Sequence, residues 1–223
     1  MKMLLCVDAW SDFDMAANAF SKGPDRQSVT QLKGFFEQHE VTICETGTTV
    51  FETAYQVTRA LAREKYHLAL KMGLGIAYHP EIAVGSAVNI IKEKPGDFGR
   101  IQNQQWQDIY ALGRLDAEAV PHFKGGFINM NNSYLNVFLE YRKVVGVTVN
   151  TFGASALAEQ RRQLYKADVE STNGLGFVYP CLYERQPFYH VLTIQENLAT
   201  GAVAEQGAKE QLNLYLIEIL QRI

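Results

Sequence analysis

Apolar and polar positions follow one another along the chain in a pattern that predicts strands and helices in alternation. Short apolar runs at residues 3–7, 41–44, 67–72, 83–91, 144–151 and 188–194 are typical of buried strands. Apolar spacing predicts helices over residues 28–38, 50–65, 154–166, 175–183 and 206–223. This alternation over residues 1–223 predicts a single α/β domain built in layers.

Polar side chains follow several of these strands. Asp8, Ser11, Asp12 and Asp14 come after the first strand, and Gln195, Glu196 and Asn197 come after the last one. A third polar cluster, Glu170 to Asn173, stands before Gly174 and the apolar helix that follows it. In α/β proteins, ligands bind at the carboxyl ends of strands. The three clusters are therefore the first candidates for a site.

Glycine and proline mark the expected turns. The strand over residues 67–72 is expected to end at Gly73-Leu74-Gly75, and a turn is expected at Gly23-Pro24-Asp25. Residues 92–100 are expected to form an exposed turn. Residues 101–143 show no regular pattern, and the stretch from Asn129 to Asn132 is expected to be part of a loop.

Composition and charge exclude several classes of function. The chain has 21 basic and 24 acidic residues, a net charge of −3, so it has no basic footprint for nucleic acid. No apolar run reaches the roughly 18 residues of a membrane span, and the N-terminus is expected to be a strand rather than a signal peptide. Three scattered cysteines and five histidines without ligand spacing predict a cytoplasmic protein with no disulfide and no metal site.

Several segments, taken in order, resemble one known family. They are Glu45-Thr46-Gly47 with the helix start after it, the glycine-rich stretch from Leu70 to Ala77, Val147 to Thr151, Asp168 to Gly174, and Pro187 to Ile194. Together they resemble the nucleoside phosphorylase and nucleosidase superfamily. Within it, the chain is most similar to futalosine hydrolase, and also to methylthioadenosine/adenosylhomocysteine nucleosidase. The resemblance spans nearly the whole chain and is weakest over residues 101–143.

The resemblance implies a three-layer α/β/α fold with a mixed central sheet. It also implies a small-molecule nucleoside as substrate, no cofactor, no nucleic-acid or membrane partner, and assembly as a homodimer with the pocket near the subunit interface.

Several site positions depart from the family pattern. Where the family has a Met-Glu pair whose glutamate holds the ribose hydroxyls, this chain has Thr172 and Asn173. The position of the acid that protonates the leaving base carries Glu196, and that of the water-activating glutamate carries Asp12. An arginine of the family is Leu192 here. The family scaffold is thus combined with a divergent active site.

Cleavage of an N-ribosidic bond requires a particular set of groups. An acid protonates the leaving base, a carboxylate deprotonates a water on the opposite face, and acceptors hold the ribose hydroxyls. The resemblance assigns the acid to Glu196 and the water base to Asp12. Substrate contacts are assigned to Asn173 with Glu170 and Thr172, to the backbone at Gly73 and Gly75, and to Phe152, which would stack on the base.

Each assignment has a purely structural alternative. Asp12 and Asn173 are residue types that commonly cap helices, and Glu196 could be a solvated carboxylate at a strand end. Gly73 and Gly75 could form a turn, and Phe152 could be a core residue.

Three functions remain open at this point. The first is an N-ribosyl hydrolase of the futalosine hydrolase type, which would act in menaquinone biosynthesis. The second is a catalytically impaired relative that binds a nucleoside-like ligand or pairs with an active subunit. The third, a nucleoside phosphorylase, is ranked last because Leu192 replaces the arginine that a phosphate site would use.

Overall fold

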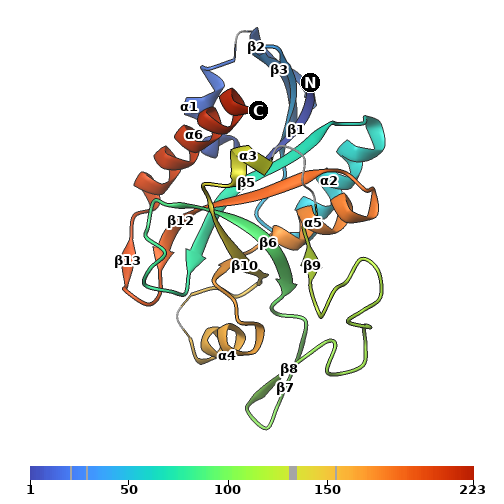
Figure 1. Cartoon of the computed structure of the whole chain (residues 1–223), viewed down its shortest axis with the longest axis vertical. Helices are drawn as coiled ribbons and strands as arrows, with labels where there is room; N and C mark the ends of the chain where they lie inside the picture. The colour runs from blue at the N-terminus through green and yellow to red at the C-terminus, as the bar shows by residue number, and fades with distance from the viewer. Residues whose placement is uncertain (21, 29, 131–134, 154) are drawn as a thin grey trace.

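The computed structural model describes residues 1–20, 22–28, 30–130, 135–153 and 155–223 (Figure 1). Its strands are β1 (Lys2–Val7), β2 (Lys22–Ser28), β3 (Gln31–Phe36), β4 (His39–Glu45), β5 (Leu68–Ala77), β6 (Ala87–Pro95), β7 (Gly99–Gln102), β8 (Gln105–Asp108), β9 (Phe127–Ile128), β10 (Arg142–Thr148), β11 (Val169–Ser171), β12 (Phe188–Asn197) and β13 (Ala202–Val203). Its helices are the 3₁₀ turn η1 (Trp10–Asp12), α1 (Asp14–Ala17), α2 (Val50–Arg63), α3 (Leu135–Phe138), α4 (Ala156–Tyr165), α5 (Gly174–Tyr183) and α6 (Glu205–Arg222).

The central sheet is mixed, and part of it closes on itself. Its order is β13-β12-β6-β10-β11-β5-β1-β4-β3-β2, with β9 beside β6, and β12 also pairs with β5. The strands β5, β12, β6, β10 and β11 therefore form a closed ring. β5 runs parallel to β1 and β12 and antiparallel to β11. This arrangement brings the carboxyl ends of β1, β10 and β11 beside the stretch of β5 from Leu74 to Ile76.

Helices cover both faces of the sheet, as Figure 1 shows. Adjacent residues of β1 point to opposite faces, as the pleat of a strand requires. Leu5 packs in one cluster with Leu212 and Leu216 of α6, and Leu4 packs in another with Val57 of α2 and Phe177 of α5. The predicted three-layer α/β/α fold with a mixed sheet is confirmed.

The local sequence explains why two helices near the site form where they do. Thr49 caps α2, because its Oγ1 accepts from Glu52 N at 3.3 Å while Glu52 Oε2 accepts from Thr49 N at 3.3 Å. The cap fixes Thr48 and Thr49 at the edge of the sheet. α5 is apolar on nearly all sides and is buried, as expected for a core helix.

The predicted helix over residues 28–38 is wrong. β3 occupies this segment, paired with β2 on one side and with β4 on the other. Phe36 is buried while Phe35 is exposed, which is the alternation of a strand. The spacing of Leu32, Phe35 and Phe36 suits a helix face equally well. The segment is a strand because it pairs with β4. The turn expected at Gly23-Pro24-Asp25 lies within β2, the edge strand, where proline is tolerated.

Two strand boundaries also differ from expectation. β5 does not stop at Met72 but continues through Gly73 and Gly75 to Ala77, since both glycines lie in its ladder with β12. β6 begins at Ala87 and extends to Pro95, into the segment expected to be a turn.

The irregular middle segment contains a β7–β8 hairpin, β9 and α3. Of the residues expected in its loop, 131 and 132 lie outside the described part of the chain, as does 154, where a helix was expected to begin. No helix in the described ranges is both long and apolar enough to cross a membrane.

Candidate active site

A pocket of about 510 Å³ lies at the carboxyl ends of the strands. It extends along the sheet from β10, past β11 and β5, to β1 and the start of α2, with α6 at its side. Its lining residues are Asp8, Ala9, Ser11, Asp12, Thr48, Thr49, Leu74, Gly75, Ile76, Asn150, Phe152, Glu170, Ser171, Thr172, Gln195 and Lys209. Five of the residues predicted for the site, Asp12, Gly75, Phe152, Glu170 and Thr172, are among them.

Asp12 ends the η1 turn and is only 6% exposed. Its Oδ2 accepts from Ala9 N at 3.2 Å, and Lys209 Nζ lies 3.7 Å from its Oδ1. Burial and then repulsion from Asp8 raise the pKa of Asp12 above its usual value, while the charge of Lys209 opposes the rise. A carboxylate with a raised pKa is a stronger base, so the side chain is suited to accept a proton from water.

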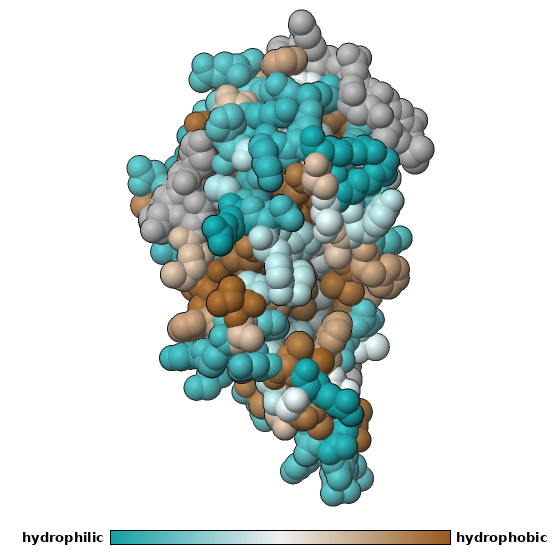
Figure 2. Space-filling view, turned by 90° about the vertical axis from the view of Figure 1, so that its right-hand side faces the viewer, coloured by the Kyte–Doolittle hydropathy of each residue, from teal (hydrophilic) through white to brown (hydrophobic). Residues whose placement is uncertain are grey.

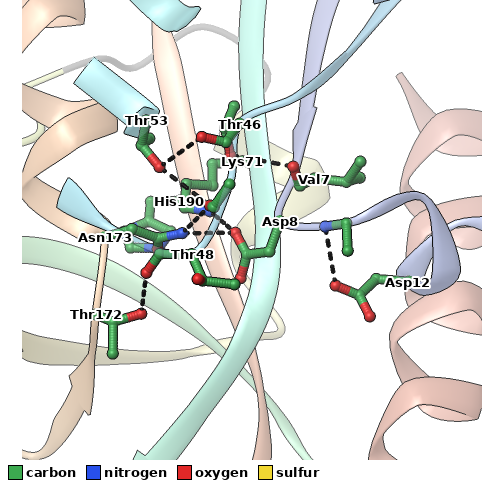
Figure 3. A network of polar contacts seen from close by, with 12 residues as sticks. Val7, Asp8, Asp12, Thr46, Thr48, Thr53, Lys71, Thr172, Asn173 and His190 are labelled. Atoms are coloured by element: carbon green, nitrogen blue, oxygen red, sulfur yellow. Dashed lines mark hydrogen bonds and ion pairs between the residues drawn. The ribbon is translucent and has the colours of Figure 1, made fainter. Parts of the chain in front are cut away.

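Asp8 follows β1 and lies between Asn173 and Asp12 in the close view of Figure 3. Its Oδ1 accepts from the ammonium of Lys71 and, at 2.8 Å, from Asn173 Nδ2. Lys71 comes from β5 and is completely buried, so Asp8 supplies the charge that its burial requires. The result is a fixed carboxylate at the wall of the pocket.

Asn173 precedes α5, but its side chain makes no cap hydrogen bond to that helix. Its Nδ2 donates to Gly47 O at 2.9 Å as well as to Asp8, and the residue is 1% exposed. It is absent from the pocket lining. Asn173 therefore joins the start of α5 to Asp8 and to the loop before α2.

Glu170 lines the pocket from β11 and is held by three donors. Its Oε2 accepts from Tyr78 Oη and from Arg161 at 3.3 Å, and its Oε1 accepts from Gly153 N at 2.9 Å. Arg161 is itself buried and also pairs with Asp97 at 2.9 Å. This network fixes the loop after β10, which carries Phe152.

The remaining predicted binding residues fall into two groups. Thr172 donates to Thr48 O and lines the pocket, as does Phe152, which is 64% exposed. Gly75 lines the pocket directly, whereas Gly73 lies behind Asp8: a Cβ at Gly73 would stand 2.8 Å from Asp8 Oδ2. The lining thus combines the apolar side chains of Leu74, Ile76 and Phe152 with the carboxylates of Asp8 and Asp12.

Glu196 occupies a different position from the other candidates. It lies near the end of β12, pairs with Val203 of β13, and is half-buried. A register shift between Ile194 and Glu196 leaves Gln195, not Glu196, in the pocket lining. The structure therefore brings Asp12 and Glu170 into one pocket and leaves Glu196 outside its lining.

Reasoning from the sequence missed two contributors. Lys71 stands in an apolar run, where nothing in the pattern reveals its partner. Lys209 belongs to the last helix, and nothing in the sequence connects that helix with a site. Asp8 was noticeable only as one of four polar residues after a strand. Within the described residues, no group of three or more His, Cys, Asp or Glu could hold a metal ion.

Comparison with solved structures identifies the fold. The chain superposes on the methylthioadenosine/adenosylhomocysteine nucleosidase of Campylobacter jejuni with a TM-score of 0.82 and 14% identity, covering 100% of both chains. The Streptococcus pneumoniae MTA/SAH nucleosidase in complex with 8-aminoadenine gives 0.82 and 15%, again over 100% of both chains. Native futalosine hydrolase of Helicobacter pylori gives 0.79 and 13%, covering 100% of this chain and 98% of the other.

No family model matches the sequence. No curated protein matches it significantly either. The chain nevertheless shares the fold of these nucleosidases over its whole length, which is the fold that the sequence resemblance implies.

Proposed function

We propose that this protein is an N-ribosyl hydrolase that releases the base from a nucleoside derivative, with Asp12 as the base that activates water. The observation that carries the proposal is the buried Asp12 carboxylate, with its raised pKa, in a pocket at the carboxyl ends of the strands. Solved structures of the same fold are nucleosidases, which favours the same class of reaction here.

In the proposed reaction, the bond between C1′ and the base nitrogen breaks as a water oxygen bonds to C1′. Asp12 takes a proton from that water, and the departing base receives a proton at nitrogen, so the products are free base and free sugar. The base would lie against Leu74, Ile76 and Phe152, because aromatic and aliphatic side chains suit its flat faces. The sugar would then lie beside Asp8 and Asp12.

We retain Glu196 as the proposed acid for the leaving base. Glu170 lines the pocket, but Tyr78, Arg161 and Gly153 already occupy its oxygens. Glu196 follows directly after the lining residue Gln195 and pairs with Ile76, which also lines the pocket, and this proximity supports the role. Glu196→Gln tests this role: an unchanged rate of base release would remove Glu196 from the mechanism.

Futalosine is the substrate we propose first, which would place the reaction in menaquinone biosynthesis. Methylthioadenosine and adenosylhomocysteine come next, since nucleosidases for them share the fold. The direct test incubates the pure protein with futalosine, methylthioadenosine, adenosylhomocysteine and inosine, with and without phosphate, and measures free base. Release without phosphate supports a hydrolase, and release that requires phosphate would replace it with a phosphorylase.

The phosphorylase remains the weaker candidate. Among the residues that the structure describes, Lys209 is the single cationic side chain lining the pocket, and it is paired with Asp12. Three carboxylates, Asp8, Asp12 and Glu170, share that lining and would repel phosphate.

A catalytically impaired binder is the second candidate, and one observation favours it. The two positions at which the family resemblance places key carboxylates, Asn173 and Glu196, both lie outside the lining of the pocket. Binding of a nucleoside without release of base from any of the four compounds would show that the protein is such a binder.

We also propose that the protein forms a homodimer through the face that carries α2 and α5. Figure 2 shows apolar side chains gathered in the middle of the surface on that side of the molecule. Phe51, Tyr55 and Tyr183 on these helices are each more than half exposed. An exposed patch of this kind marks an interaction surface in many proteins. Light scattering should give the mass of two chains, and Phe51→Glu with Tyr55→Glu should give one.

We propose the cytoplasm as the location of this reaction. Cys6, Cys44 and Cys181 are free thiols, all of them buried. Free thiols are common in reducing compartments. Fractionation of the native cells with a cytoplasmic marker would test the assignment.

A further inference from the structure

The two oxygens of the Asp8 carboxylate have different surroundings. Oδ1 accepts from both Lys71 Nζ and Asn173 Nδ2. Oδ2 accepts no hydrogen bond from any residue in the described ranges, although Asp8 lines the pocket and its side chain is 16% exposed. One oxygen therefore holds the group in place, and the other remains available to a ligand.

The orientation of Asp8 is fixed by two buried residues, Lys71 and Asn173. Lys71 is fully buried in β5, so moving Asp8 away would leave an ammonium group uncompensated in the protein interior. Asn173 adds a second constraint, since its amide also donates to Gly47 O. A carboxylate fixed before the ligand arrives loses little entropy on binding, and this favours tight contacts.

The backbone behind Asp8 is shaped to admit the free oxygen. A Cβ at Gly73 would lie 2.8 Å from Asp8 Oδ2 and 3.4 Å from its Cγ. Only glycine at position 73 leaves this space, because any side chain there would displace the carboxylate. Gly73 thus contributes to the site through Asp8 rather than by touching a ligand.

We propose that Asp8 binds the vicinal hydroxyls of the substrate's sugar and makes the enzyme selective for ribo- over deoxyribonucleosides. This inference rests on the proposed function and assigns to Asp8 the contact that the family resemblance gives to Asn173. Asn173 has its amide nitrogen committed to Asp8 and Gly47 and lies outside the pocket lining, so it acts as a positioning residue. A charged acceptor with an unclaimed oxygen matches the donor character of a diol.

The neighbours of Asp8 fit a sugar. Ser11, Thr48 and Thr49 line the pocket with it, whereas Leu74, Ile76 and Phe152 line the part proposed for the base. Asp12, the proposed water base, is close enough for the charge of Asp8 to raise its pKa. A sugar held by Asp8 would therefore present C1′ between the base pocket and the water held by Asp12.

The test compares ribo- and deoxyribonucleosides in wild type, Asp8→Ala and Asp8→Asn. Calorimetry would measure the binding of adenosine and inosine, each beside its 2′-deoxy and 3′-deoxy analogue. Wild type should prefer the ribonucleoside by about 10- to 100-fold, the range expected for a hydrogen bond to a charged group. Asp8→Ala should bind both forms with nearly equal, weak affinity, and Asp8→Asn should keep part of the preference.

Asp12→Asn is the matched control, because it removes a pocket carboxylate while leaving Asp8 in place. It should retain the ribose preference. Thermal melting verifies that each variant is folded, and Lys71→Met should weaken ribose preference through the loss of positioning alone.

An Asp8→Ala protein that is folded and keeps the full ribose preference would overturn the inference and leave the proposed function intact. A wild type that binds none of the six nucleosides would also overturn the inference. The proposed function would fall only if no base were released from futalosine, methylthioadenosine, adenosylhomocysteine or inosine.

Discussion

Lys209 Nζ lies 3.7 Å from Asp12 Oδ1, so an ammonium group of α6 faces the carboxylate proposed to activate water. Burial raises the pKa of Asp12, and Lys209 partly offsets that rise. The proposed base must be ionised to act, so the rate should fall as the pH drops through the raised pKa of Asp12. The balance between burial and Lys209 therefore sets the acid limb of the pH profile.

Lys209→Met should shift that acid limb to higher pH, since the group that lowers the pKa of Asp12 is gone. Lys209→Arg, which keeps the positive charge, is the control and should leave the limb near its original position. The measurement is kcat/KM for base release across the acid range. An acid limb that is the same in all three proteins would mean that another group limits the rate.

Asp12→Asn should separate activity from stability. The folded-state pKa of Asp12 lies above its unfolded value, so the folded protein binds more protons in the window between the two values, and stability falls as the pH rises through it. At neutral pH the ionised Asp12 is therefore a cost that asparagine removes. Thermal melting at pH 7 should show a Tm equal to or above that of wild type, in a protein that has lost its activity. A clear drop in Tm would mean that Asp12 is instead required for folding.

Arg161 should be essential for stability. It is buried between Asp97 and Glu170, whose side chain is also buried. Arg161→Met leaves the buried charge of Glu170 without a cationic partner and should cost about 3–5 kcal/mol in the free energy of unfolding. The double variant Arg161→Met with Glu170→Gln should recover part of this loss. Urea unfolding measures these two variants and Glu170→Gln alone, and additive changes in the free energy of unfolding would show that the pair is not coupled.

Gly73→Ala should reduce activity more than it reduces stability. The new methyl group would meet the end of the Asp8 side chain, which can shift without moving the backbone. Kinetics should therefore show a fall in kcat/KM of tenfold or more, with a change in Tm of only a few degrees. Gly207→Ala is the control, since its Cβ would have no neighbour nearer than 4.0 Å. Equal kinetics in the two variants would contradict the role of Gly73.

The sequence predicted those parts of the fold that depend on strong local patterns. The apolar helix α5 and the buried strand β12 appear close to where they were expected. β3 was mistaken for a helix because its aromatic residues fit both periods, and only pairing with β4 distinguishes them. The predicted range of β5 ends too early because glycine usually ends a strand, whereas Gly73 here makes room for Asp8 within the strand.

Sequence reasoning was less complete for the site. It pointed to Asp12, Glu170, Thr172, Gly75 and Phe152, which the structure gathers around one pocket. It could not find the pairing of Lys71 with Asp8, because 63 residues separate them and neither stands in a recognisable motif. A lysine in an apolar strand acquires its meaning only from the partner that the fold supplies.

The proposed function depends above all on Asp12 as the group that activates water for cleavage of an N-ribosidic bond. Its most direct test measures base release by wild type and Asp12→Asn at pH 7, together with the affinity of each for the same nucleoside. We expect release by wild type without phosphate, and a loss of about a hundredfold or more in Asp12→Asn with affinity largely retained. Equal rates in the two proteins, or no release by wild type, would contradict the proposed function.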